Sequence, residues 1–240
     1  MPKFDPIGSF ISQADKIYGQ ALDGCLWPAE YAEKTAECCK RFLYEIRTYN
    51  EATQQIMHIE QKDYLDAFAE KWVECWLEGK PFVIEKCRRM LISWAGRSCE
   101  LWAMGLGRLK HHMANETYGE AAKHVWRLEF IYHDLRRRHP EWGLEANGRR
   151  AFQGEQSLAQ FSLSNGSISE AINSDSAAIQ GEGVGIITLE ELGKYTSPSA
   201  VYTQAKLVTM AQAGAVGGFV CAITNTNLNE EWQKIKNARQ

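Results

Sequence analysis

The chain has 240 residues, of which 45% are hydrophobic and 24% charged, the balance of a globular protein with one large domain or a domain and an appendage. Its net charge of −3 excludes binding to nucleic acid through overall basicity, although a local basic patch can still serve. The seven cysteines form no CxxC pair, which argues against a zinc site and a disulfide framework and favours a reducing compartment. There is no secretory signal and no apolar run of membrane-spanning length, so we expect a soluble protein with no membrane partner.

The first third of the chain, residues 1–79, is predicted to be a helical appendage. Pro28 suits a helix start because its missing N–H costs nothing there, and apolar residues recur at helical spacing from it to Ile46. A second helix has an apolar face running from Tyr64 to Trp76, and Gly79 ends it.

The pattern changes at Pro81, where residues 82–85 (FVIE) predict a short buried strand. A helix is expected to start near Ser93, and a longer one to cover residues 118–138. Gly105 and Gly107 separate the two helices, and the pattern for a strand between them, near 109–115, is weak.

The remaining sequence alternates strands and helices. Residues 157–173 predict a β-hairpin that turns at Asn165-Gly166. Strands are expected at 186–191 and 217–224, with a helix at about 198–213 between them. This alternation predicts an α/β fold with a mainly parallel sheet flanked by helices.

The segment EKCRRMLISW, residues 85–94, joins a predicted strand to a predicted helix. Such a loop favours phosphate, because the N–H groups and the dipole of the helix N-terminus attract negative charge. The standard motif G-x-x-x-x-G-K-[ST] fails, since Leu91 and Ile92 replace its second glycine and its lysine. Ser93 keeps the metal-binding hydroxyl. Three cations gather in the loop instead: Lys86, Arg88 and Arg89. Taken alone, they could be solvated charges at a strand end.

Two later strands also end in polar residues. The strand at 186–191 ends in Glu190 and Glu191, a pair suited to holding Mg²⁺ and activating water. The next strand ends in Thr224 and Asn225, which could sense a terminal phosphate. The alternatives are exposed acids after a strand and an ordinary polar turn.

Together these segments resemble the ATPase domain of phage large terminases, P-loop NTPases of the ASCE type with an added catalytic glutamate. One branch of that family has a deviant Walker A loop, K-x-R-Q/R-x-x-x-S-W, and EKCRRMLISW matches it. A long helix with a proline and tryptophan end (120–142), a hairpin with an N-G turn, an acidic Walker B strand end and a polar strand end follow in the family's order. The resemblance covers residues 80–228, leaving 229–240 as the start of a linker.

By this resemblance, Lys86 would contact the β- and γ-phosphates of ATP, and Met90 would lie in the nucleotide-binding loop. Arg88 or Arg89 would bind or stabilise the γ-phosphate. Ser93 would hold Mg²⁺.

The resemblance gives the later strands the remaining roles. Glu190 would share the Mg²⁺ ion with the loop serine, although the family usually has aspartate there. Glu191 would activate water, and Thr224 and Asn225 would couple hydrolysis to movement. Relatives place an arginine where this chain reads Gln180-Gly181, so Arg149 or Arg150 would have to replace it.

The implied function is ATP-driven translocation of double-stranded DNA into a procapsid in the host cell cytoplasm. Its partners would be the portal protein, the small terminase subunit and further copies of the chain in a homo-oligomeric ring. The family's nuclease domain is not expected among these residues.

Three alternatives stay open. Another P-loop translocase would carry helicase motifs, and the sequence has none; a degenerate P-loop scaffold would bind without hydrolysis. A metal-binding regulator would rest on His111-His112, but adjacent histidines point apart and are expected at the surface. The basic run 136–138 is interpreted as a solvated helix end rather than a DNA contact.

Overall fold

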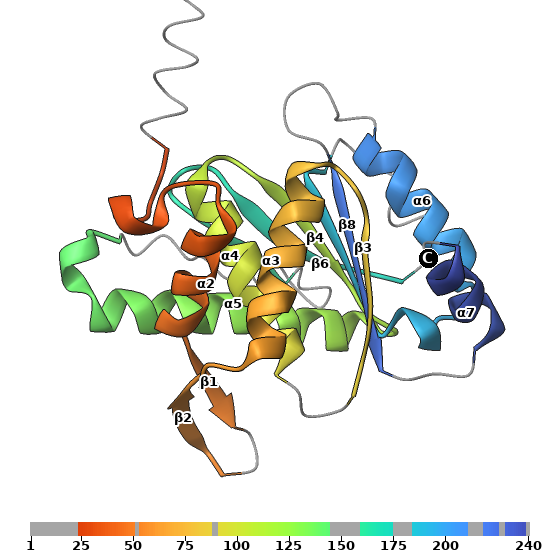
Figure 1. Cartoon of the computed structure of the whole chain (residues 1–240), viewed down its shortest axis with the longest axis horizontal. Coiled ribbons are helices and arrows are strands. Elements are labelled where there is room, and N and C mark those ends of the chain that lie inside the picture. Colours follow the sequence, from red (N-terminus) through yellow and green to blue (C-terminus); the bar gives the residue numbers. More distant parts are fainter. Residues whose placement is uncertain are drawn as a thin grey trace, which may run out of the picture.

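The computed structural model describes residues 24–50, 53–87, 91–144, 159–174, 184–210, 218–225 and 229–238. A six-stranded sheet crosses these residues in the order β3-β8-β7-β4-β6-β5 (Figure 1). Neighbouring strands pair in parallel except β5 and β6, which form the predicted antiparallel hairpin. The α/β class with a mainly parallel sheet is thus confirmed.

The sheet strands are β3 (Phe82–Lys86), β4 (Lys110–Ala114), β5 (Gln160–Ser162), β6 (Ile168–Ile172), β7 (Ile186–Glu190) and β8 (Phe219–Asn225). The helices are α2 (Ala36–Glu45), α3 (Asp63–Leu77), α4 (Ile92–Leu106), α5 (Tyr118–Arg138), α6 (Pro198–Met210) and α7 (Glu230–Asn237). In the described parts of the chain, no helix is long and apolar enough to span a bilayer. Residues 157–158, 211–213 and 217, at the ends of three predicted elements, lie outside the described residues.

Helices cover both faces of the sheet (Figure 1). Along β8, the side chains of Phe219, Cys221 and Ile223 belong to the apolar cluster that includes α2–α5. The alternate residues Val220 and Ala222 belong to a second cluster with α6 and α7. Successive side chains of a strand point to opposite faces, so this strand is buried on both sides and reads as a continuous apolar run.

The parallel pairing brings three strand ends together. Lys86 of β3 pairs with Asn225 of β8, and Ile223 of β8 pairs with Glu190 of β7. All three strands run in the same direction, and therefore their polar carboxyl ends lie side by side at one edge of the sheet.

The described part of the first third, which begins at residue 24, contains two α-helices, but the first of them starts later than expected. Pro28 precedes only a 3₁₀ turn, Ala29–Tyr31. The α-helix begins at Ala36 because Thr35 caps it, accepting a hydrogen bond from the Cys38 backbone N–H at 3.2 Å.

The hairpin of β1 (Arg47–Asn50) and β2 (Gln55–His58) is a second departure, since only helices were expected there. All of β2 is exposed, so it lacks the alternation that reveals a strand. Tyr64, expected on the apolar face of α3, is also exposed, whereas Trp72 on that helix is fully buried and packs against Phe219 of β8, with ring centroids 5.0 Å apart. The division of the chain at residue 79 stays a prediction.

Gly105 does not separate two helices; it lies inside α4. A Cβ atom there would lie 2.0 Å from Cε2 of Trp27, which packs against the helix and donates from Nε1 to the carbonyl of Trp102 at 2.8 Å. Gly105 is therefore a packing residue, and the predicted weak strand is the fully formed β4.

Candidate functional site

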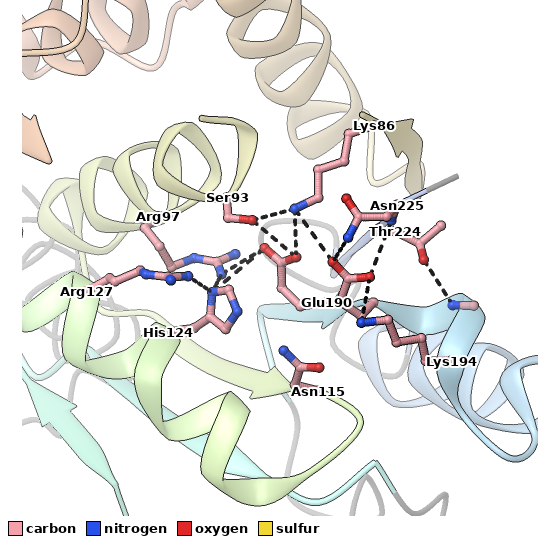
Figure 2. Close-up of polar contacts among 12 residues, drawn as sticks. Lys86, Ser93, Arg97, Asn115, His124, Arg127, Glu190, Lys194, Thr224 and Asn225 are labelled. Carbon is pink, nitrogen blue, oxygen red and sulfur yellow. Dashed lines mark hydrogen bonds and ion pairs between the residues drawn. The ribbon is translucent and has the colours of Figure 1, made fainter. Parts of the chain in front are cut away.

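The polar ends of β3, β7 and β8 meet the N-terminus of α4 (Figure 2). Lys86 is the last residue of β3, and its Nζ lies 2.6 Å from Oγ of Ser93. The same Nζ lies 3.7 Å from Oε2 of Glu190 and 3.9 Å from Oε1 of Glu191. With a side chain only 11% exposed, Lys86 is not a solvated cation. It is the central positive charge of the cluster.

The other loop residues assigned from the sequence, Arg88, Arg89 and Met90, lie outside the described residues. Gln180-Gly181 and the pair Arg149 and Arg150 also lie outside them. Their assignments stay predictions.

Helix α4 starts directly after Leu91, which replaces the second glycine of the standard phosphate loop. Leu91 has a φ of 58°, a left-handed conformation that costs a non-glycine residue about 1–2 kcal/mol. The first turn of α4 holds no acidic side chain. A cavity of about 230 Å³ opens here, lined by Lys86, Cys87, Leu91, Ile92, Ser93, Trp94 and Arg127. A helix N-terminus facing a cavity with two basic side chains suits a phosphate group.

Glu190 is almost fully buried, with 1% of its side chain exposed. Its Oε2 accepts a 3.5 Å hydrogen bond from Oγ of Ser93. Its Oε1 accepts from Nη1 of Arg97 at 3.2 Å. The interpretation of this residue as an exposed acid is therefore wrong.

Glu191 is held against the end of β8. Its backbone, with a φ of 55°, donates to the carbonyl of Ile223 at 2.6 Å. Its Oε1 accepts from Nδ2 of Asn225 at 2.6 Å, and Nζ of Lys194 lies 3.5 Å from its Oε2. The Glu191 side chain is 15% exposed, so its carboxylate is held in place by Asn225 and Lys194 and is still accessible to solvent.

Thr224 and Asn225 lie within β8, not in a polar turn. Oγ1 of Thr224 accepts from the backbone N–H of Gly193 at 3.3 Å. Thr224 thus connects the end of β8 to the segment that follows Glu191, and Asn225 connects it to Glu191 itself.

Three site residues were missed in the sequence: Arg97, Glu100 and His124, all buried. Burial opposes the charge of Arg97, but Glu100 and Glu190 outweigh it and raise the pKa of the guanidinium. Burial raises the pKa of Glu100, although the charge of Arg97 opposes this shift. Burial and the charge of Arg97 both lower the pKa of His124. For Arg97 and Glu100 the available signal was a charged i, i+3 pair inside a mostly apolar helix, α4; His124, on α5, had no such signal.

The expectation of surface histidines is wrong, because His111 and His112 are both buried in β4. His111 Nδ1 lies 2.8 Å from Oγ of Ser169, and His112 Nε2 lies 2.6 Å from Oε1 of Glu170. Neighbouring residues of a strand point to opposite faces, so the burial of both histidines means that both faces of β4 are covered. Burial lowers the pKa of His111, which favours a neutral ring.

The basic run 136–138 is partly solvated, as interpreted, but two of its members are ion-paired. Nη2 of Arg137 and Nε of Arg138 each lie 2.9 Å from an oxygen of Asp134. Of these two arginines, Arg137 is mostly exposed and Arg138 is mostly buried.

The oxygen atoms of the site fit a magnesium ion. The Ser93 hydroxyl and Oε2 of Glu190 lie 3.5 Å apart, and Nζ of Lys86 lies 2.6 Å from the first and 3.7 Å from the second, so a cation already lies beside both oxygens. Among the described residues, no group of three or more His, Cys, Asp and Glu side chains could hold a metal. Mg²⁺ is usually bound by one or two protein oxygens together with substrate phosphates, which matches this donor set.

No protein-family model and no curated protein sequence matches the chain. Among solved structures, the large terminase of bacteriophage HK97 is similar, with a TM-score of 0.54 and 10% identity over 79% of this chain. The chain shares the fold of a phage large terminase. It spans 37% of the length of that terminase. Two further structures are less similar. The large terminase ATPase domain of Thermus phage P74-26 has a TM-score of 0.44 and 15% identity, and the match covers 64% of this chain and 62% of that one. The large terminase of a thermophilic bacteriophage has a TM-score of 0.40 and 17% identity, and the match covers 65% of this chain and 35% of that one.

Proposed function

We propose that this chain is the ATP-hydrolysing part of a viral DNA-packaging motor, the large terminase subunit. One observation carries the proposal: a lysine, a serine hydroxyl and two carboxylates converge beside a helix N-terminus, at the ends of adjacent parallel strands. Phosphoryl transfer requires this combination, because it depends on positioning and on charge neutralisation. The fold shared with the HK97 large terminase supports the same reading.

Lys86 would bind the β- and γ-phosphates. Its ammonium group now bonds to Ser93 and lies near both carboxylates, so the positive charge of Lys86 is balanced by groups of the site itself. Binding of a phosphate would draw the ammonium away from Ser93 and free that hydroxyl. Lys86 would thus exchange a weak partner for a charged one, which is the stronger kind of hydrogen bond.

Ser93 and Glu190 would hold Mg²⁺ through Oγ and Oε2, the two oxygens that lie 3.5 Å apart. When bound, the ion neutralises charge on the phosphate oxygens. The long Glu190 side chain reaches Ser93 from the end of β7, so the replacement of the usual aspartate is compatible with this role.

Glu191 would orient and deprotonate the attacking water. Asn225 and Lys194 hold its carboxylate in place, and its exposed edge gives water access. Thr224 and Asn225 would relay a change at Glu191 into β8 and the segment after β7. Arg88, Arg89 and Met90 would complete the phosphate loop.

The motor itself would be a ring of chains that binds the portal protein, the small terminase subunit and double-stranded DNA in the host cell cytoplasm. The second candidate is a P-loop scaffold that does not hydrolyse ATP. Leu91 favours it, since a left-handed leucine replaces the flexible glycine of an ordinary phosphate loop. Another P-loop translocase would share the hydrolytic residues and differ in its partners.

The test compares ATP turnover and ATP binding in the wild-type chain and Glu191→Gln. We expect the variant to lose at least about 99% of turnover, because a general base contributes about 10²–10⁴-fold, while its affinity for ATP changes little. Glu74→Gln, at an exposed carboxylate on α3, is the matched control and should retain turnover. Unchanged hydrolysis in Glu191→Gln would refute the assignment; ATP binding without any hydrolysis by the wild type, with or without DNA, would favour the scaffold.

A further inference from the structure

Arg97 is a fully buried arginine placed directly behind Glu190 (Figure 2). It lies on α4, four residues after Ser93, so the two side chains project from the same side of the helix. Burying a guanidinium is costly unless every part of it is paired. The position therefore requires an explanation beyond general packing.

The orientation of Arg97 is set by its own helix. Its Nε and Nη2 donate to the two oxygens of Glu100 at 2.5 and 2.6 Å, a bidentate pair that fixes the plane of the guanidinium. Glu100 is itself held by Oγ1 of Thr188, which donates at 2.6 Å. The bidentate pair leaves Nη1 to face β7 and α5.

Nη1 of Arg97 reaches Oε1 of Glu190 at 3.2 Å. It also lies 2.9 Å from Nδ1 of His124 and 3.5 Å from Sδ of Met113. The other oxygen of Glu190, Oε2, is the one near Ser93 and Lys86. Arg97 therefore binds the oxygen that does not take part in the cluster, and it leaves the other oxygen directed at Ser93.

We propose that Arg97 is a positioning residue that holds Glu190 for metal binding. A glutamate has one more rotatable bond than an aspartate, so its carboxylate needs a second anchor to keep a fixed orientation. Arg97 supplies that anchor, and Glu100 and Thr188 fix the anchor in turn. This inference rests on the proposed function, because it assigns a role to Glu190 as a ligand of Mg²⁺.

The experiment measures binding of a fluorescent ATP analogue as Mg²⁺ is titrated, with EDTA giving the metal-free affinity. We compare the wild type with Arg97→Lys and with the double variant Arg97→Gln/Glu100→Gln, which removes both charges of the buried pair. Loss of a residue that orients a metal ligand costs about 10–100-fold in metal affinity. We expect the Mg²⁺ midpoint to rise by about tenfold or more in the double variant and by less in Arg97→Lys, with the metal-free affinity unchanged in both.

Arg41→Lys, an exposed arginine on α2, is the matched control, and circular dichroism and thermal melting check folding. Thr188→Val tests the same anchor with a milder change and should shift the Mg²⁺ midpoint in the same direction. A wild-type midpoint in folded Arg97 variants would overturn the positioning role, and so would unfolded Arg97 variants together with a wild-type midpoint in Thr188→Val. If the wild type itself shows no Mg²⁺-dependent nucleotide binding, both the proposed function and this inference are wrong.

Discussion

Asp134, near the end of α5, carries a stability contribution that depends on pH. Its side chain is 2% exposed and accepts hydrogen bonds from Arg47 on β1 and from Arg137 and Arg138 on its own helix, with Nε of Arg47 2.9 Å away. Burial opposes ionisation of Asp134, but the hydrogen bonds from the three arginines outweigh it and lower its pKa from 3.8 to about 2. Asp134 therefore connects the exposed hairpin to the helix that supplies His124 to the site.

The size of the effect follows from that shift. A depressed carboxylate pKa stabilises the folded state at pH values above the unfolded pKa, and the contribution is lost as the pH falls through the folded pKa. A difference of about 1.8 units, from 3.8 to about 2, corresponds to about 2.5 kcal/mol. We expect Asp134→Asn to lower the free energy of unfolding by about 2–3 kcal/mol at pH 7.

The assay is urea denaturation of the wild type and Asp134→Asn at a series of pH values from 7 down to the lowest at which both fold. The difference in free energy of unfolding should stay constant to about pH 4 and shrink towards pH 2. Asp63→Asn, an exposed aspartate in the first turn of α3, should cost less than about 1 kcal/mol. A difference for Asp134→Asn that does not change between pH 7 and the acid limit would refute the ionic origin of the effect.

Two further predictions test the site and the packing of α4. Lys86→Ala should weaken ATP binding by at least about tenfold, since it removes the charged group that binds the phosphates. Lys80→Ala, at a lysine whose side chain is 69% exposed, should leave ATP binding unchanged. Equal ATP binding in both variants would show that Lys86 is misassigned. Gly105→Ala should destabilise the fold by about 1–3 kcal/mol in urea, because the new methyl group overlaps Trp27. Gly119→Ala in α5, where the methyl group meets nothing within 4 Å, should be neutral or stabilising, and an equal loss in both glycine variants would contradict the packing argument.

Local pattern in the sequence was enough to place the elements that frame the site. The apolar stripe of α5 predicted its bounds, residues 118–138, and the run FVIE predicted β3. Patterns failed where tertiary contacts override them: β2 has no buried face, so its sequence does not alternate. Gly105 was misread as a helix end because its packing partner, Trp27, is distant in the chain.

Sequence pattern alone predicted three strands whose ends lie at or next to Lys86, Glu190 and Asn225, and parallel pairing makes such ends meet. How these ends meet could be seen only in the folded chain, because hydrogen-bond partners separated by 97 residues, as Ser93 and Glu190 are, leave no periodic pattern in the sequence. The tertiary structure also decided that Arg97 is buried. A charged pair one turn apart on a helix usually faces solvent, and nothing short of the packing of α4 against β7 distinguishes an exposed pair from one that orients a buried carboxylate.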